Sequence, residues 1–284
     1  MARSVVRGMI VDAHVHFWDP GELEYPWLEP MPELRRAFLP ADFTRAADGA
    51  SVSRLVAVEA NCAPSQGARE VEFFERLSKT DPRVAGIVAY VDLTDTAARD
   101  RALDGLASHS LVKGVRHNIQ GQPPGFCVQR PFVDGVREVG RRGYTFDLCI
   151  TADQFADAIA LVERCPETRF ALDHCGKPQI RDGDVAWPDL IERLSRFAHV
   201  SCKISGLLTE ASPDSALDDS LRYAMHAAEC FGAKRVMFGS DWPVLTVAGA
   251  YAEWLCLARA LTASWPASDA RRFFGDNASE FYSL

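Results

Sequence analysis

Eight short apolar runs recur along the chain and alternate with stretches of helical periodicity. The runs are rich in β-branched residues and are bounded by polar, glycine or proline positions. We predict strands over residues 9–14, 55–60, 84–91, 112–117, 145–150, 169–174, 199–204 and 235–240. We predict helices over residues 66–80, 94–108, 131–142, 151–165, 187–198, 214–231 and 247–264.

This alternation favours one fold class. Strands that are apolar along their whole length are typical of parallel sheets covered by helices. Eight strand–helix repeats in 284 residues suit a closed barrel better than an open, doubly wound sheet. No glycine-rich dinucleotide or P-loop motif follows any predicted strand, which argues against those nucleotide-binding alternatives. We therefore predict an α/β protein in which residues 1–284 form a single (β/α)8 TIM barrel.

The composition indicates small-molecule partners. The net charge of −8 comes from interspersed charges, which argues against a nucleic-acid groove and against binding to an anionic membrane surface. No apolar stretch reaches the length of a membrane span, and residues 1–7 lack the apolar core of a secretory signal, so we expect a cytoplasmic protein. The eight cysteines contain no C-x-x-C pair and predict neither a disulfide framework nor a zinc knuckle.

Two connecting segments are longer than a compact barrel requires. Residues 17–40 hold Trp18, Tyr25, Trp27 and five prolines, and residues 121–130 are rich in glycine and proline at their start. Loops at the carboxyl ends of barrel strands form the walls of substrate pockets, so we predict both as active-site loops. Trp18 and Trp27 are then expected to pack against a ring of the substrate. Ordinary surface packing of these loops is the alternative.

Polar and ionisable residues gather at the carboxyl ends of the predicted strands, where barrel enzymes assemble their active sites. These residues are His14, His16, Glu59, Asn61, Asp92, Arg116, His117, Asp147, Asp173, His174, Lys203, Ser205 and Asp241.

Three histidines and one aspartate form the sharpest subset. His14 and His16 are two positions apart on a strand and therefore point to the same side. With His174 and Asp241 they can hold one zinc-like divalent cation, or, without metal, can activate a water next to a carbonyl. Taken singly, His174 could be a hydrogen-bonded core histidine and Asp241 a helix N-cap.

Six motifs that span nearly the whole chain carry a family resemblance. They lie at residues 11–20 (VDAHVHFWDP), 25–28 (YPWL), 114–117 (GVRH), 173–178 (DHCGKP), 203–207 (KISGL) and 238–243 (FGSDWP). As a set they resemble the amidohydrolase superfamily. The branch they resemble is the amidohydrolase-2 group of fuconolactonase-like lactonases, which is related to pyrone-dicarboxylate lactonase.

The resemblance implies a (β/α)8 fold and assigns roles to residues. His14 and His16 would be the strand-one pair, His174 the strand-six histidine, and Asp241 the strand-eight acid that handles the water proton. Many members of the superfamily build a two-metal site on a strand-four lysine, but here Lys113 lies at the beginning of that strand. We therefore expect at most one divalent cation, zinc-like, with a metal-free site as the alternative.

Together these residues predict a hydrolase that opens a lactone ring, a cyclic carboxylic ester. In this mechanism Asp241 takes a proton from water, His174 helps to hold the carbonyl and Arg116 stabilises the oxyanion. The aromatic first loop favours the lactone of a sugar acid, as in carbohydrate catabolism. The predicted substrate-binding residues are His117, Trp18, Trp27, Asp147, Glu59 and Lys177.

Three other functions stay open. A lactonase of the pyrone-dicarboxylate or muconolactone type would use the cationic side chains to bind a carboxylate. A non-oxidative decarboxylase of the same superfamily would depend on its metal, and a non-catalytic ligand-binding barrel would not turn over any lactone. The sequence does not predict the oligomeric state.

Overall fold

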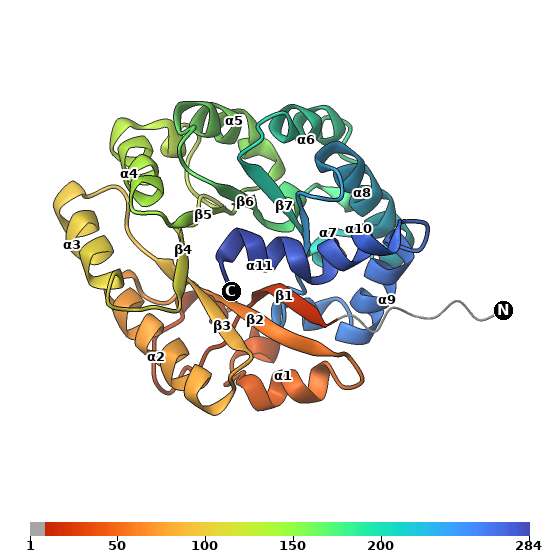
Figure 1. Ribbon diagram of the computed structural model, residues 1–284, viewed down its shortest axis with the longest axis horizontal. Coiled ribbons are helices and arrows are strands. Elements are labelled where there is room, and N and C mark those ends of the chain that lie inside the picture. The colour runs from red at the N-terminus through yellow and green to blue at the C-terminus, as the bar shows by residue number, and fades with distance from the viewer. Residues whose placement is uncertain (1–8) are drawn as a thin grey trace.

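The computed structural model describes residues 9–284. The prediction that residues 1–7 lack a secretory signal therefore lies outside the described residues. Eight parallel strands lie side by side in chain order and are surrounded by helices (Figure 1). They are β1 (Ile10–Val15), β2 (Val52–Val58), β3 (Val84–Tyr90), β4 (Val112–Arg116), β5 (Thr145–Leu148), β6 (Phe170–Leu172), β7 (Val200–Ile204) and β8 (Val236–Phe238). The prediction of a single (β/α)8 barrel is confirmed.

Seven helices follow the strands at the predicted places and form the outer ring. They are α2 (Gly67–Thr80), α3 (Thr96–Leu106), α4 (Arg130–Arg141), α5 (Phe155–Arg164), α6 (Trp187–Ser195), α8 (Ala216–Phe231) and α9 (Tyr251–Leu261). α5 and α9 begin later than predicted because short 3-10 turns, Ala152–Gln154 and Val244–Val247, precede them. Four short helices were not predicted, namely α1 (Pro40–Ala46), α7 (Leu207–Glu210), α10 (Ala267–Arg271) and α11 (Asn277–Tyr282).

The segment after β8 closes the barrel against β1. Val15 and Trp242 form a parallel bridge, and the backbone N–H of His16 donates to the Trp242 carbonyl at 2.7 Å. The N–H of Asp241 donates to the His14 carbonyl at 2.9 Å. These bonds hold the carboxyl ends of the first and last strands together, so residues far apart in the sequence lie side by side.

A buried aspartate strengthens this closure. Asp12 is fully buried, and its Oδ1 accepts a hydrogen bond from the backbone N–H of Ser240 at 2.8 Å. Its Oδ2 accepts from the hydroxyl of Tyr251, in α9, at 3.1 Å. Each of these bonds stabilises the fold because an unpaired buried carboxylate would lose its hydration without compensation.

Small apolar side chains fill the barrel interior, and α11 closes its amino-terminal end. The interior cluster contains Val11, Ala13, Val56, Val58, Val88, Ala171 and Met237, together with Ala278 and Tyr282 of α11. In Figure 1 α11 lies across the centre of the ring of strands. The side chain of Asn277 anchors this helix by donating to the carbonyls of Ala233 and Val236 at 2.8 and 2.7 Å. The amino-terminal end is therefore closed, and access to the interior is left to the opposite end.

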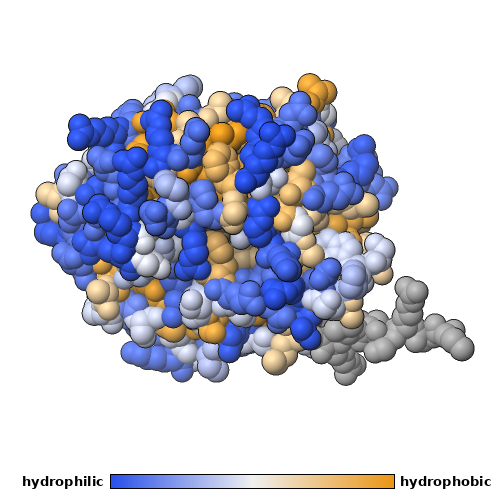
Figure 2. All heavy atoms as spheres, turned by 45° about the horizontal axis from the view of Figure 1, so that its top comes forward, coloured by the Kyte–Doolittle hydropathy of each residue, from blue (hydrophilic) through white to orange (hydrophobic). Residues whose placement is uncertain are grey.

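The face of the molecule seen in Figure 2 carries mostly hydrophilic side chains, with hydrophobic residues between them. Within residues 9–284, none of the helices combines the length and the apolar character that crossing a membrane requires. All eight cysteines are free thiols, and six of them are buried. The six buried thiols therefore pack as small apolar residues.

Candidate active site

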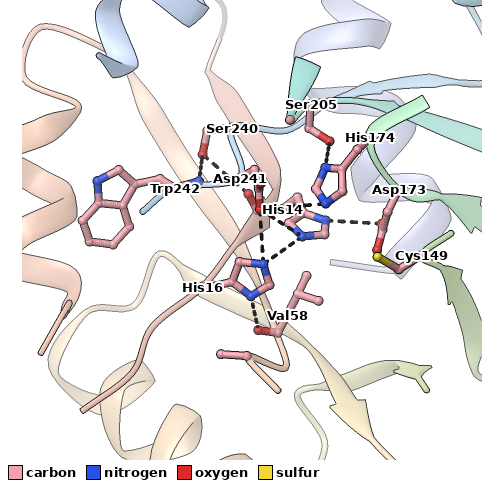
Figure 3. Close-up of polar contacts among 12 residues, drawn as sticks. His14, His16, Val58, Cys149, Asp173, His174, Ser205, Ser240, Asp241 and Trp242 are labelled. Atoms are coloured by element: carbon pink, nitrogen blue, oxygen red, sulfur yellow. Dashed lines mark hydrogen bonds and ion pairs between the residues drawn. The ribbon is translucent and has the colours of Figure 1, made fainter. Parts of the chain in front are cut away.

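His14 and His16 meet at the carboxyl end of β1. Their Nε2 atoms lie 3.1 Å apart, and both residues are buried. His16 donates its Nδ1 proton to the Val58 carbonyl at 2.9 Å. The Nε2 of His16 faces the Nε2 of His14 and also lies 3.3 Å from Asp241 Oδ1. Figure 3 shows both rings pointing toward the carboxylate of Asp241.

His174 follows β6 in an uncommon backbone conformation. Its φ is +53°, as is that of Cys175. The ring packs so closely on Gly206 that a Cβ there would lie 2.6 Å from His174 Nδ1, which explains the glycine in this loop. Nδ1 lies 2.9 Å from the hydroxyl of Ser205. Burial lowers the pKa of His174 to about 4, so the imidazole is neutral at neutral pH.

Asp241 brings a carboxylate to these rings. Its Oδ1 lies 3.3 Å from the Nε2 of His16, 3.6 Å from that of His14 and 3.9 Å from that of His174. Burial by itself raises the pKa of Asp241, but the neighbouring His174 and His16 outweigh it and hold that pKa well below its usual range. Asp241 is therefore ionised and can accept a proton.

His14, His16 and Asp241 fit one divalent cation, and His174 lies next to them. Donors around a tetrahedral zinc, at about 2.0–2.1 Å from the metal, are separated from one another by about 3.3 Å. Several of the spacings between the three Nε2 atoms and Asp241 Oδ1 lie close to that value. Two groups of close ligand atoms occur within residues 9–284, namely His14 with His16 and Asp241, and His14 with Asp173 and His174. Both groups include His14, which is consistent with the prediction of at most one cation.

A buried ionic network lies behind the histidines. Lys203 Nζ is 3.0 Å from Asp173 Oδ1 and also donates to Asp147. Arg116 Nε donates to Glu59 Oε1 at 2.5 Å, and its Nη1 donates to Asp173 Oδ2 at 3.2 Å. Burial lowers the pKa of Lys203, but the carboxylates of Asp147 and Asp173 more than offset this and raise it. The network therefore holds paired charges in the barrel interior.

A cavity of about 220 Å³ opens next to the cluster. Its lining combines the reactive groups with amides, cations and one large aromatic ring. The lining residues are His16, Trp27, Ala60, Asn61, Arg116, Asn118, Gln120, Cys149, His174, Lys177, Asp241 and Val244. Mixed polar groups around a small hollow are typical of a site for a small polar ligand.

The structure brings six of the predicted site residues to this cavity: His16, His174, Asp241, Arg116, Lys177 and Trp27. His14 lies directly beneath, where it contacts His16 and Asp241.

Four predicted substrate-binding residues lie away from the cavity lining. Glu59 and Asp147 are fully buried and serve as partners of Arg116 and Lys203. Trp18 is fully buried, and its Nε1 donates to backbone carbonyls of its own loop. The Trp18 ring packs edge-on against Trp27 at 5.3 Å between centroids, so it supports the residue that does reach the cavity.

His117 is the fourth of these residues. Its Nδ1 accepts a hydrogen bond from the N–H of Leu93 at 3.1 Å, and its ring packs between Phe126 and Phe132. Burial lowers the pKa of His117. A neutral, enclosed imidazole in this position supports the loop after β4 instead of facing a ligand. Phe126 belongs to the predicted loop 121–130, whose residues are not among those that line the cavity.

Sequence reasoning missed the amides of Asn118 and Gln120. Both directly follow β4, so their position after a strand end was a usable signal. The amide of Asn118 donates to Asn61 Oδ1 at 3.4 Å, which joins the loops after β4 and β2. Asn61 has a φ of +53°. Positive φ at Asn61, His174 and Asp241 concentrates backbone strain at the cavity, as is common in functional sites.

Comparisons with known proteins agree on the type of molecule. The family model described as Amidohydrolase matches residues 11–284. The chain is 30% identical to L-fucono-1,5-lactonase of Burkholderia ambifaria over 281 residues, which covers 96% of this chain and 95% of the relative. It is 29% identical to L-fucono-1,5-lactonase of Burkholderia multivorans, with 96% of each chain covered. A crystal structure of an amidohydrolase from Burkholderia multivorans with bound zinc superposes with a TM-score of 0.87 at 29% identity, covering 97% of this chain and 99% of that one.

Proposed function

Because the chain belongs to the amidohydrolase family, as its motifs predicted, we propose that it hydrolyses the ring ester of a sugar-acid lactone. One structural observation carries this proposal: an ionised Asp241 lies among three imidazoles at the wall of a small polar cavity. The likeness to two L-fucono-1,5-lactonases along almost the whole chain supports the choice of reaction.

The chain's own residues can carry out each step of ring opening. Asp241 accepts a proton from a water as its oxygen attacks the lactone carbonyl, and the carbonyl becomes a tetrahedral oxyanion. When the ring C–O bond breaks, protonated Asp241 returns its proton to the departing ring oxygen. The product is one open chain with a hydroxyl and a carboxylic acid, which releases its proton to solvent and becomes a carboxylate. His16 and His174 line the same wall and orient the water and the carbonyl.

Arg116 is the group we assign to the oxyanion. A guanidinium has five N–H donors, and those of Arg116 bond the carboxylate and carbonyl of Glu59 and the carboxylate of Asp173. The remaining N–H groups can face the cavity, which Arg116 lines. Because its planar group is held from behind, it meets the developing charge without having to reorganise.

A divalent cation, when bound, would be held by His14, His16, His174 and Asp241 and would polarise the carbonyl and acidify a bound water. The chain's groups position the substrate in either case. Loop 17–40 supplies Trp27, whose Nε1 donates to the Ala60 carbonyl at 2.7 Å, so its ring is fixed at the cavity wall. An immobilised aromatic ring beside Asn61, Asn118 and Gln120 suits a ring that bears hydroxyl groups.

A dicarboxylate lactone is the second candidate substrate. Lys177 and Arg116 both line the cavity and could bind a carboxylate. We rank it second because the amide groups match hydroxyls and because the chain resembles two L-fucono-1,5-lactonases along almost its whole length.

The test is a pH-indicator hydrolysis screen of aldonolactones and dicarboxylate lactones, with and without chelator, using wild type and Asp241→Asn. We expect turnover of at least one aldonolactone by the wild type and loss of that turnover in the variant. Turnover of dicarboxylate lactones alone would favour the second candidate. Release of carbon dioxide from aromatic acids with no lactone opened would overturn the proposal.

A further inference from the structure

Loop 17–40 is fastened at two points to the segment that follows β2. The Nε1 of Trp27 donates to the Ala60 carbonyl at 2.7 Å, and the N–H of Ala63 donates to the Glu24 carbonyl at 2.8 Å. Trp27 lines the cavity. A displacement of Ala60 would therefore move the aromatic part of the cavity wall.

The segment after β2 also carries Asn61, a second group of the cavity wall. Asn61 has a φ of +53°, and its backbone N–H donates to Glu59 Oε2 at 2.7 Å. A residue other than glycine stays in this conformation only where its surroundings hold it. Glu59 Oε1 accepts from Arg116, so one buried carboxylate joins Asn61 to the group that we assign to the oxyanion.

The side chain of Glu70 reaches the same segment from the first turn of α2. Its Oε1 accepts a hydrogen bond from the N–H of Ala60 at 3.1 Å. Ala60 is thus held through its N–H, while its carbonyl holds Trp27. Glu70 is almost fully buried, so removing its carboxyl would leave the Ala60 N–H without a partner.

Two further buried groups, the Tyr25 hydroxyl and the Cys62 thiol, lie next to Glu70. Burial and the neighbouring Glu70 raise the pKa of both groups, so both keep their protons. The Tyr25 hydroxyl has no hydrogen-bond partner at ordinary distance within residues 9–284, so the Glu70 carboxyl beside it is the group that can pair with it. Glu70 therefore adjoins both segments that form the wall.

The charged and titratable groups around Glu70 keep it a neutral acid at pH 7. These groups are Glu59 after β2, Cys62 in the following loop, Tyr25 in loop 17–40 and Arg116 at the end of β4. Burial and Glu59 raise the pKa of Glu70 to about 8, and the backbone donor, Tyr25 and Arg116 offset this only in part. Above that pH two buried carboxylates share one guanidinium and repel each other.

We propose that Glu70, as a neutral acid, is a positioning residue for substrate binding. Through Ala60 it keeps Trp27 and Asn61 at the cavity wall. When Glu70 loses its proton, repulsion from Glu59 loosens this wall, so substrate affinity falls while the histidine cluster is unchanged. The inference rests on the proposed function for the nature of the ligand, a ring that bears hydroxyl groups.

The first measurement needs no substrate. In protein labelled with ¹⁵N-tryptophan, the indole N–H resonance of Trp27, assigned by its loss in Trp27→Phe, reports the hydrogen bond to Ala60. We expect it to shift between about pH 7 and about pH 9 in wild type and to stay constant in Glu70→Gln. The glutamine keeps an oxygen for the Ala60 N–H but cannot ionise. Glu72→Gln, an exposed change on the same helix, is the control and should behave as wild type.

The second measurement is steady-state kinetics on the aldonolactone that the screen identifies, with initial rates corrected for spontaneous hydrolysis. From pH 7 to pH 9 the wild-type KM should rise at least about threefold relative to that of Glu70→Gln. At pH 7, Glu70→Ala should raise KM at least about tenfold and change kcat by less than about twofold, and Glu70→Gln should restore the wild-type KM.

A Trp27 resonance that does not respond to pH in wild type, or that shifts equally in Glu70→Gln, would overturn the inference. So would a loss in Glu70→Ala that falls on kcat and leaves KM unchanged. If Glu70→Ala does not fold, the comparison of wild type with Glu70→Gln still decides. Absence of lactone turnover would count against the proposed function alone, because the Trp27 resonance is measured without substrate.

Discussion

Asp241 is the residue on which the proposed chemistry depends most. Its Oδ1 lies within 3.3–3.9 Å of the Nε2 atoms of His16, His14 and His174, and no other carboxylate lines the cavity among the described residues. Asp241→Asn keeps the size of the side chain and one acceptor oxygen but removes its charge and its basicity. We expect kcat for lactone opening to fall by about 10²–10⁴-fold with little change in KM.

Asp92→Asn is the matched control for this change. Asp92 follows β3 at the same end of the barrel, but it is partly exposed and bonds Thr94 in its own loop. Its amide variant should retain wild-type kcat. Equal losses in both variants would mean that the effect of Asp241→Asn is structural, and full activity of Asp241→Asn would remove it from the mechanism.

Glu70 makes stability depend on pH. It is buried in the first turn of α2, where Oε1 accepts from the N–H of Ala60 at 3.1 Å. Burial, with the neighbouring Glu59, raises the pKa of Glu70 from 4.5 to about 8. The folded state therefore binds more protons than the unfolded state between these values, and stability falls as pH rises from about 4.5 to about 8.

Glu70→Gln should abolish most of this dependence. At pH 9 the free energy of unfolding of the variant should exceed that of wild type by an amount on the order of a few kcal/mol, and at pH 4 the two should be similar. Urea denaturation of both proteins at a series of pH values measures this difference in the free energy of unfolding. Parallel pH profiles for the two proteins would contradict the assignment.

At the level of residues, the sequence predicted which side chains lie toward the carboxyl end of the barrel. It did not predict how deep each side chain lies along the barrel axis. His14, His16, His174 and Asp241 were found because they follow strands. Asp147 also belongs to a strand, β5, but its side chain lies within the barrel and pairs with Lys203. The depth of a side chain along the barrel axis depends on how far neighbouring strands are staggered, and the sequence of a single strand does not specify this stagger. Tyr282 gave no signal because its contact crosses 135 positions of the chain.

At the level of elements, the loops after β6 and β7 are fitted to each other. Gly206 has a φ of +64°, and a Cβ there would meet His174 Nδ1 at 2.6 Å. We expect Gly206→Ala to displace the His174 ring and to lower kcat by more than about tenfold, since small misplacements of catalytic groups are costly. Steady-state kinetics and thermal unfolding measure the two effects.

Gly183→Ala separates the clash from the backbone strain. Gly183 also has a positive φ, +72°, but its Cβ would have no neighbour within 4 Å. Each substitution should lower the free energy of unfolding by about 1 kcal/mol, because alanine disfavours the left-handed conformation. Gly206→Ala should lower it further because of the clash with His174, and of the two variants only Gly206→Ala should lose activity. Similar activities of the two variants would show that the ring of His174 tolerates displacement.

The strands and long helices could be predicted because each has a local pattern of apolar residues. α1, α7, α10 and α11 could not, because they have between four and seven residues each. Such short helices are marginal by themselves and form where tertiary contacts hold them. α11, for example, depends on Asn277 and Tyr282, whose partners lie in or near β8 and β5.

At the level of the whole molecule, one short helix completes both the fold and the buried network. Removing residues 277–284 would expose the interior cluster and leave Asp147 without the hydroxyl of Tyr282. We expect the free energy of unfolding to fall by at least about 3 kcal/mol, the usual effect of deleting one large buried aromatic side chain. Urea denaturation and binding of a hydrophobic dye measure it. If the truncated protein unfolded at the wild-type urea midpoint and bound no dye, the barrel would be shown to be stable without α11.

The order in which the chain is made gives α11 a further consequence. β1 is synthesised first, yet its partners at the barrel seam belong to the segment after β8, and the floor under the interior is formed by a helix that follows every strand. During synthesis the strands of the growing chain therefore form a sheet that is not yet closed. One edge strand lacks its hydrogen-bonding partner, and the apolar side chains of the barrel interior are exposed to solvent. Nascent chains of this protein should depend on chaperone shielding until α11 has emerged, and only then gain a competent active site.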